Sequence, residues 1–171
     1  MSAPRIVLAA GLVVLAQLLN VCVLARWSWP GATPDLTLLV VVALALLGGP
    51  ASGVVAGLSA GLLVDLTPPG AGPLGLTAVA YALAGAVAGR WHRPGERSLL
   101  LPVTAAAAAA LVASAVQALI PLLSGRESIG STLTGLGASV LYAVLGALVV
   151  VPVVVLLDRL VEGDPAEAVR L

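Results

Sequence analysis

Two aspartates have the clearest potential for chemistry, because each lies at one end of a long apolar stretch. Asp35 and Asp65 are both fifteen residues from Pro50, so a chain that turns back at this proline brings the two carboxylates to the same depth. Two carboxylates can act as an acid and a base, but an enzyme also needs polar groups that hold a substrate and stabilise a transition state. The apolar stretches carry three amides: Gln17, Asn20 and Gln117. We expect interhelical hydrogen bonds from these amides and no catalytic site.

Asp35 has a structural interpretation as part of a helix start. Thr33 can cap a helix, and Pro34 suits the first helical position. An acidic side chain near a helix N-terminus also interacts favourably with the helix dipole. The segment 33–35 therefore predicts a helix start with Asp35 as a capping residue.

Asp65 is harder to explain, because it lies at the C-terminal end of its predicted helix, where the helix dipole disfavours an anion. We therefore expect a partner for this carboxylate, and Arg26 and Arg126 are the candidates on the same predicted side of the membrane. A structural ion pair is favoured. A protein-binding role and a role in ligand or ion binding remain alternatives.

The chain has few of the residues that metal sites, disulfides and nucleic-acid binding require. It has one cysteine, Cys22, and one histidine, His92, so neither an internal disulfide nor a histidine metal site is expected, and no cofactor is predicted. His92 lies in the basic turn 90–97, which we interpret as a cytoplasmic turn that sets the topology, with contact to anionic lipid headgroups as the alternative. Eight arginines balance eight acidic residues, which leaves no basic surface for a nucleic acid.

The elements that position these side chains are predicted to be membrane-spanning helices. The chain has 171 residues, of which 60% are hydrophobic and 9% charged, more apolar material than a soluble domain of this size can bury. Stretches that approach the 20 or so apolar residues of a membrane span occur six times, at 6–25, 35–48, 51–66, 73–89, 98–123 and 133–157. The sequence therefore predicts an all-α, polytopic bundle of six transmembrane helices in one domain, 1–171, with a short cytoplasmic tail, 158–171.

The arginines indicate the orientation of this bundle, since short cytoplasmic loops collect positive charge. With six spans and a cytoplasmic N-terminus, two arginines lie outside, Arg26 and Arg126. Six lie in the cytoplasm: Arg5, Arg90, Arg93, Arg97, Arg159 and Arg170. Spans two and three could instead be one kinked span, but five spans would divide the arginines evenly. We therefore favour six spans with both termini in the cytoplasm.

Glycines at a spacing of four form a strip on the third predicted span. Gly53, Gly57 and Gly61 share one helix face, and Gly85 and Gly89 form a shorter strip on the fourth span. Such strips permit close approach of a neighbouring backbone. Packing within the chain is favoured, and contact with another membrane protein is the alternative.

The stretch 34–90, about a third of the chain, resembles the central part of the MreD family, small membrane proteins of the bacterial rod-shape system. The resemblance begins with Pro34, Asp35 and Leu36. It continues through Gly53, Gly57, Gly61 and the run 62–66, which contains Asp65. Its last members are Gly75, Tyr81, Gly85 and Gly89.

This resemblance implies a non-enzymatic scaffold in the bacterial cytoplasmic membrane. A member of this family is expected to bind MreC, a periplasmic coiled-coil protein. It helps to couple MreB filaments to the elongation glycosyltransferase and the class B penicillin-binding protein. Membrane lipid is the remaining expected partner.

The alternative function is that of a substrate-binding S-component of an energy-coupling-factor vitamin transporter, which is also small and six-helical. Members of that class often carry Ala-x-x-x-Ala in the first helix, which docks them to the transporter. The predicted first span, 6–25, lacks this pattern. The MreD resemblance is therefore favoured.

Overall fold

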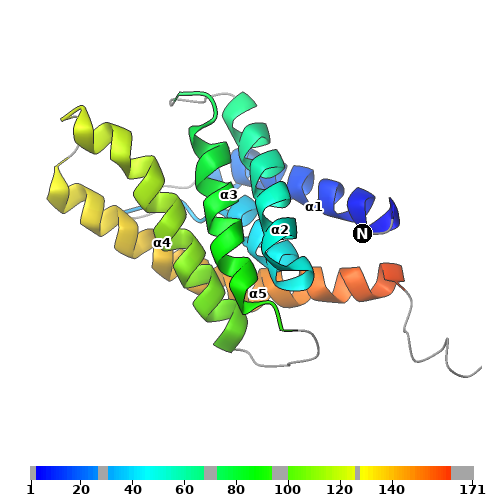
Figure 1. The fold of residues 1–171 in the computed structure, drawn as a ribbon. Coiled ribbons are helices and arrows are strands. Elements are labelled where there is room, and N and C mark those ends of the chain that lie inside the picture. Colours follow the sequence, from blue (N-terminus) through cyan, green and yellow to red (C-terminus); the bar gives the residue numbers. More distant parts are fainter. Residues whose placement is uncertain (1–2, 27–30, 68–72, 94–99, 126–127, 163–171) are drawn as a thin grey trace, which may run out of the picture.

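The structure, a computed structural model, describes residues 3–26, 31–67, 73–93, 100–125 and 128–162. Within these ranges every regular element is a helix (Figure 1). The helices are α1 (Ala3–Cys22), α2 (Leu36–Leu66), α3 (Leu76–Ala88), α4 (Leu100–Leu123) and α5 (Ile129–Glu162), with short 3-10 turns η1 (Leu24–Arg26) and η2 (Gly89–Trp91). By length and composition, four of the described helices could each cross a membrane, namely α1, α2, α4 and α5.

Helix α2 is broken in the middle and folds back on itself. Gly49 has φ 79° and ψ −174°, a backbone conformation that glycine adopts without steric cost, and the following Pro50 cannot donate a helical hydrogen bond. An unbroken helix would separate Asp35 and Asp65 by about 45 Å. Instead, Asp35 bonds to Tyr81 and Asp65 bonds to the start of the same helix, α3. We call the two parts, 36–48 and 50–66, the first and second arms of the α2 hairpin.

Helix α3 packs antiparallel to the second arm through backbone contacts. Gly53 faces Gly85, Gly57 faces Tyr81 and Gly61 faces Ala78. Each of these glycines is so close to the opposite backbone that an added Cβ would overlap it. Farther along, Gly89 meets the turn of the hairpin at 49–50 in the same way. The glycine strips are thus placed at contacts within the chain.

The first arm is the centre of the bundle. Its side chains from Thr37 to Ala45 are all buried, which is typical of a helix surrounded on every side. Figure 1 shows α2, α3 and α4 side by side, with α5 crossing the bundle toward α1. The faces of α3 and α4 in the core are built from alanine, at 80, 84 and 88 on α3 and at 105, 106, 109, 110 and 113 on α4. Small side chains let these helices approach closely.

The outer surface of the bundle is apolar. Large aliphatic side chains are exposed on α1, on the second arm and on α5, as at Val7, Val55 and Val149, which are 72%, 68% and 65% exposed. Exposed apolar surface of this extent is typical of contact with lipid. Together with the four long apolar helices, it indicates a membrane protein.

The observed helix boundaries differ from the predicted spans at several ends. Helix α1 covers 3–22 in place of 6–25, because the 3-10 turn η1 begins at Leu24. The stretch predicted as a tail from Asp158 begins inside α5, which continues to Glu162. Asp158 remains in the helix because Arg5 binds its carboxylate. The arms of the α2 hairpin, with 13 and 17 residues, are about 20 and 25 Å long.

Candidate functional site

Asp35 connects three helices at one end of the bundle, which we call the Asp35 end. It is the N-cap of α2, and its Oδ1 accepts a hydrogen bond from the backbone N–H of Leu38 at 3.1 Å. The same oxygen accepts a hydrogen bond from Nδ2 of Asn20 on α1 at 3.2 Å. The hydroxyl of Tyr81 on α3 donates to Oδ2. The carboxylate therefore fixes α1, α2 and α3 to one another.

Asp35 is a capping residue, as the sequence predicts, but the roles expected of Thr33 and Pro34 are not observed. Thr33 and Pro34 were expected to supply the cap and the first helical residue. In the structure Asp35 itself is the cap, so both residues precede the helix. The physical reason is that a carboxylate oxygen can accept the N–H three residues later and still reach Asn20 on α1.

A second layer of hydrogen bonds lies directly beneath Asp35. Asn20 donates to the hydroxyl of Thr37 at 3.0 Å and accepts from the backbone N–H of Leu36 at 3.1 Å. Thr37 is fully buried and donates to Oε1 of Gln17 at 3.1 Å. Two of the three predicted amides thus bond across the interface between α1 and α2.

Asp65 has a partner that the sequence did not indicate. Its Oδ2 accepts hydrogen bonds from the backbone N–H groups of Gly75, at 2.8 Å, and Ala78, at 3.3 Å. Gly75 is the N-cap of α3 and has no side chain of its own to offer, so a carboxylate from the neighbouring helix caps α3. An anion at this position interacts favourably with the dipole of α3, which offsets the unfavourable end of its own helix.

The structure tests one of the two arginine partners expected for Asp65. Arg126 lies outside the described residues, and Arg26 forms no ion pair with Asp65 in the part of the chain that the structure describes. Asp35 and Asp65 nevertheless contact the same helix, since Asp35 bonds to Tyr81 and Asp65 bonds to the N–H groups of Gly75 and Ala78. This agrees with the common depth that their equal distance from Pro50 predicts.

A cavity of about 500 Å³ opens among all five helices at the Asp35 end. We call it the Asp35 cavity. One part of its wall carries Asn20, Asp35 and Tyr81. Another part carries polar side chains that make no hydrogen bond with the described protein: Ser114 and Gln117 on α4 and Ser139 on α5. These three also line an adjoining cavity of about 530 Å³, which extends to Thr132 and Gly135 near the start of α5.

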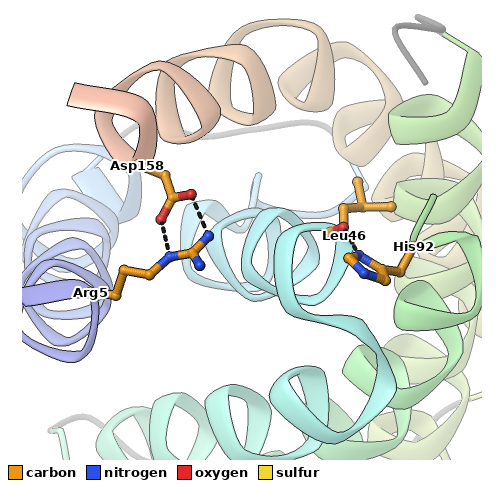
Figure 2. A network of polar contacts seen from close by, with 4 residues as sticks. All are labelled: Arg5, Leu46, His92 and Asp158. Carbon is orange, nitrogen blue, oxygen red and sulfur yellow. Dashed lines mark hydrogen bonds and ion pairs between the residues drawn. The ribbon is translucent and has the colours of Figure 1, made fainter. Parts of the chain in front are cut away.

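The opposite end of the bundle, which we call the Arg5 end, is closed by an ion pair (Figure 2). Nε of Arg5 donates to Oδ1 of Asp158 at 2.9 Å, and Nη2 donates to Oδ2 at 2.6 Å. Both side chains are largely buried. This two-point contact fastens the start of α1 to the end of α5.

His92 stabilises the turn of the α2 hairpin at the same end. Pro50 has no N–H for the carbonyl of Leu46, its partner in a regular helix. Nδ1 of His92 lies 2.5 Å from that carbonyl oxygen and donates to it (Figure 2). The sequence assigned the basic turn a role in topology, and the structure adds a hydrogen bond from this ring inside the bundle. The ring thus replaces the hydrogen bond that the proline removes.

The sequence reasoning did not single out Thr37 or Ser139, and it named Tyr81 only through the family resemblance. The sequence signal for Thr37 and Tyr81 was a hydroxyl-bearing threonine or tyrosine within a stretch of aliphatic residues. In the described ranges no three His, Cys, Asp or Glu side chains gather as metal ligands. The lone Cys22 is exposed.

No protein-family model, curated protein or solved structure matches the chain. The geometry of the two ends and the sequence resemblance are therefore the grounds for inferring function.

Proposed function

We propose that the protein is a non-enzymatic scaffold of the MreD type in the bacterial cytoplasmic membrane. In this role it binds an MreC-like periplasmic coiled-coil protein and helps to couple MreB to the peptidoglycan synthases. One observation carries the proposal. The residues of the resemblance, scattered over 34–90 in the sequence, converge on a single unit composed of the α2 hairpin and α3.

The strip glycines and the two aspartates of the resemblance have defined places in this unit. The glycines at 53, 57, 61, 85 and 89 form backbone contacts between the hairpin and α3. Asp35 and Asp65 fix the two arms to the same end of α3. Contacts between backbones leave little freedom for the helices to shift. The unit therefore suits a protein that works by presenting a fixed surface to partners.

The proposal includes the orientation of the bundle, with six crossings, both termini in the cytoplasm and the Asp35 end outside. Two arms of α2 and the short α3 add three crossings to those of α1, α4 and α5. Among the described arginines, Arg26 is at the Asp35 end. Those near the Arg5 end are Arg5, Arg90, Arg93 and Arg159. This distribution supports a cytoplasmic Arg5 end.

We infer that Asp65 holds the outer end of the second arm in the shape that the partner reads. Its negative charge stabilises the start of α3 at the proposed outer surface. In Asp65→Asn the amide oxygen can still accept both hydrogen bonds, because they converge on one oxygen, but the charge is lost. We expect this variant to reach the membrane and to bind its partner more weakly.

The test is co-purification of the tagged full chain with the MreC-like protein in mild detergent, together with rod-shape complementation. Asp35→Asn is the matched control, since an asparagine also caps a helix. We expect Asp65→Asn to lose more partner than Asp35→Asn. Equal behaviour of the two variants, or no co-purifying coiled-coil protein with the unaltered chain, would contradict the proposal.

The Asp35 cavity favours a second candidate, the S-component of a vitamin transporter. Its volume, about 500 Å³, lies in the range of small-molecule pockets. Uptake of a labelled vitamin by cells that express the chain with its transporter partners would support this candidate. Uptake no greater than in cells without the chain would exclude it.

A further inference from the structure

The Asp35 cavity combines a charged wall and a neutral polar wall in one space. Asp35, with Asn20 and Tyr81 beside it, supplies the charge. Ser114, Gln117 and Ser139 supply neutral donors and acceptors. Cavities of this volume with a few polar groups among apolar side chains are typical of small-molecule sites.

The carboxylate of Asp35 has spare capacity for a ligand. A carboxylate offers about four acceptor positions. Three are used, by the N–H of Leu38, Nδ2 of Asn20 and the hydroxyl of Tyr81, and all three donors are neutral. Over the described ranges Asp35 has no ion-pair partner, since the ion pair there joins Arg5 and Asp158 at the other end. A carboxylate that lines a cavity in a membrane bundle and has no ion-pair partner among the described residues can attract a cation.

The neutral wall also has unused hydrogen-bonding groups. Ser114, Gln117 and Ser139 are partly buried, and none of their side chains has a protein partner within the described residues. Their polar atoms are accessible from the cavity, since no fully buried side-chain polar atom of the described residues lacks a partner. A ligand that reaches both walls therefore has a cationic group for Asp35 and a polar group for this second wall.

The kind of cation follows from the remaining lining. A quaternary ammonium is usually held by a cage of aromatic rings. In the described part of the wall Tyr81 is the only aromatic side chain, and its hydroxyl is bonded to Asp35. A cation that carries N–H groups fits better, because it can donate to the free acceptor position on Oδ2.

We propose that the Asp35 cavity binds a molecule that carries a primary ammonium group, with Asp35 as its counter-ion. The second wall holds a polar group at the far end of the ligand. The ammonium comes either from a free amine or from the headgroup of an aminophospholipid. This site belongs to the chain itself and does not depend on the proposed partner.

The test measures thermal unfolding of the purified full chain in mild detergent, titrated with 4-amino-1-butanol. This probe carries an ammonium and a hydroxyl at opposite ends. The controls are 1,4-butanediol, which has no charge, and tetramethylammonium chloride, which has no N–H, all at matched ionic strength. We expect a saturable rise in unfolding temperature with the amine and none with the controls.

Variants locate the binding site. Asp35→Asn keeps the cap and the shape of the side chain, and we expect it to weaken the Kd by about tenfold or more, because a charge-assisted hydrogen bond is lost. Asp65→Asn removes a nearby charge that does not line the cavity, so its Kd should stay within about twofold of the unaltered chain. Ser114→Leu fills the cavity and should abolish binding. It tests the site independently of Asp35→Asn, whose folding could be impaired.

The source of the ammonium is distinguished in lipid nanodiscs of phosphatidylglycerol with or without phosphatidylethanolamine. A headgroup ligand raises the unfolding temperature without added amine and competes with the probe, whereas a free-amine site responds to the probe equally in both lipids. The proposal is overturned if the amine gives no saturable shift, if 1,4-butanediol gives an equal shift, or if Asp35→Asn binds as tightly as the unaltered chain. Loss of amine binding in Asp35→Asn with intact partner co-purification separates this site from the proposed function.

Discussion

The contact between Gly53 and Gly85 allows a direct test of the hairpin and α3 unit. Each glycine lies against the backbone of the other, so the methyl group of Gly53→Ala or Gly85→Ala would overlap that backbone. Overpacking of this kind costs about 1–3 kcal/mol. Alanine returns up to about 1 kcal/mol through its higher helix propensity. Because the overlapped atoms belong to the backbone and cannot rotate away, we take the upper part of this cost, about 2–3 kcal/mol, so the expected net loss is about 1–2 kcal/mol for each variant.

Gly11 provides the matched control for these two variants. It also lies inside a helix, α1, but an added Cβ there meets nothing within 4 Å. Gly11→Ala should therefore gain up to about 1 kcal/mol from helix propensity alone. Alanine substitution is thus expected to lower the free energy of unfolding at Gly53 and Gly85 and to raise it at Gly11.

Thermal unfolding of the purified chain in detergent, followed by tryptophan fluorescence, measures the difference. At about 2–4 °C per kcal/mol, the two packing variants should unfold about 2–8 °C lower, and Gly11→Ala up to about 4 °C higher. The double variant Gly53→Ala/Gly85→Ala should lose less than the sum of the single losses, because the separation forced by one methyl makes room for the other. If both packing variants unfold at or above the temperature of Gly11→Ala, the helices are not in backbone contact and the reasoning is wrong.

Three further predictions concern the Arg5 end and the orientation. In a cysteine-free background, Gly95→Cys should resist a membrane-impermeant thiol reagent in intact cells while Gly125→Cys reacts; equal labelling would contradict six crossings. Replacing His92 with Ala should cost about 1–3 kcal/mol in unfolding free energy, because the carbonyl that it bonds is left unpaired, and Gln should restore part of this as a donor; no loss would refute the bond. Arg5→Leu should destabilise by about 3 kcal/mol, since the Asp158 carboxylate loses its counter-ion, and Arg5→Leu/Asp158→Leu should recover most of that loss; a double variant as unstable as the single one would show that the unpaired Asp158 charge is not the cause.

Sequence patterns predicted the parts of the fold that depend on spacing. Pro50, equidistant from two aspartates, indicated the turn, and the structure places the break at Gly49 beside it. Thr33, Pro34 and Asp35 indicated a helix start within two residues of the observed one. All-helical architecture with long apolar helices was likewise predicted and is confirmed. The number of crossings and their orientation stay predictions.

The partner of Asp65 and the Asp35 cavity were beyond sequence reasoning. In a sequence, the expected partner of an aspartate is a residue of opposite charge, such as arginine. Asp65 instead bonds to backbone N–H groups, which almost every residue carries and which therefore leave no signal in the sequence. Asp158 looked like the start of a polar tail because its partner, Arg5, lies at the other end of the sequence. The cavity is the space that five helices leave between them, and no local sequence pattern predicts such a space.

The ion pair at the Arg5 end has a consequence for the order of assembly. It joins residues 153 positions apart, so it cannot form until α5 has been synthesised. The hairpin and α3, in contrast, make their contacts among residues 35–92 and can assemble as soon as α3 has left the ribosome. Until α5 arrives, α1 is held to α2 at its far end through Gln17 and Asn20. The start of α1 is therefore fixed only after α5 has been made, although α1 is the first helix to be synthesised.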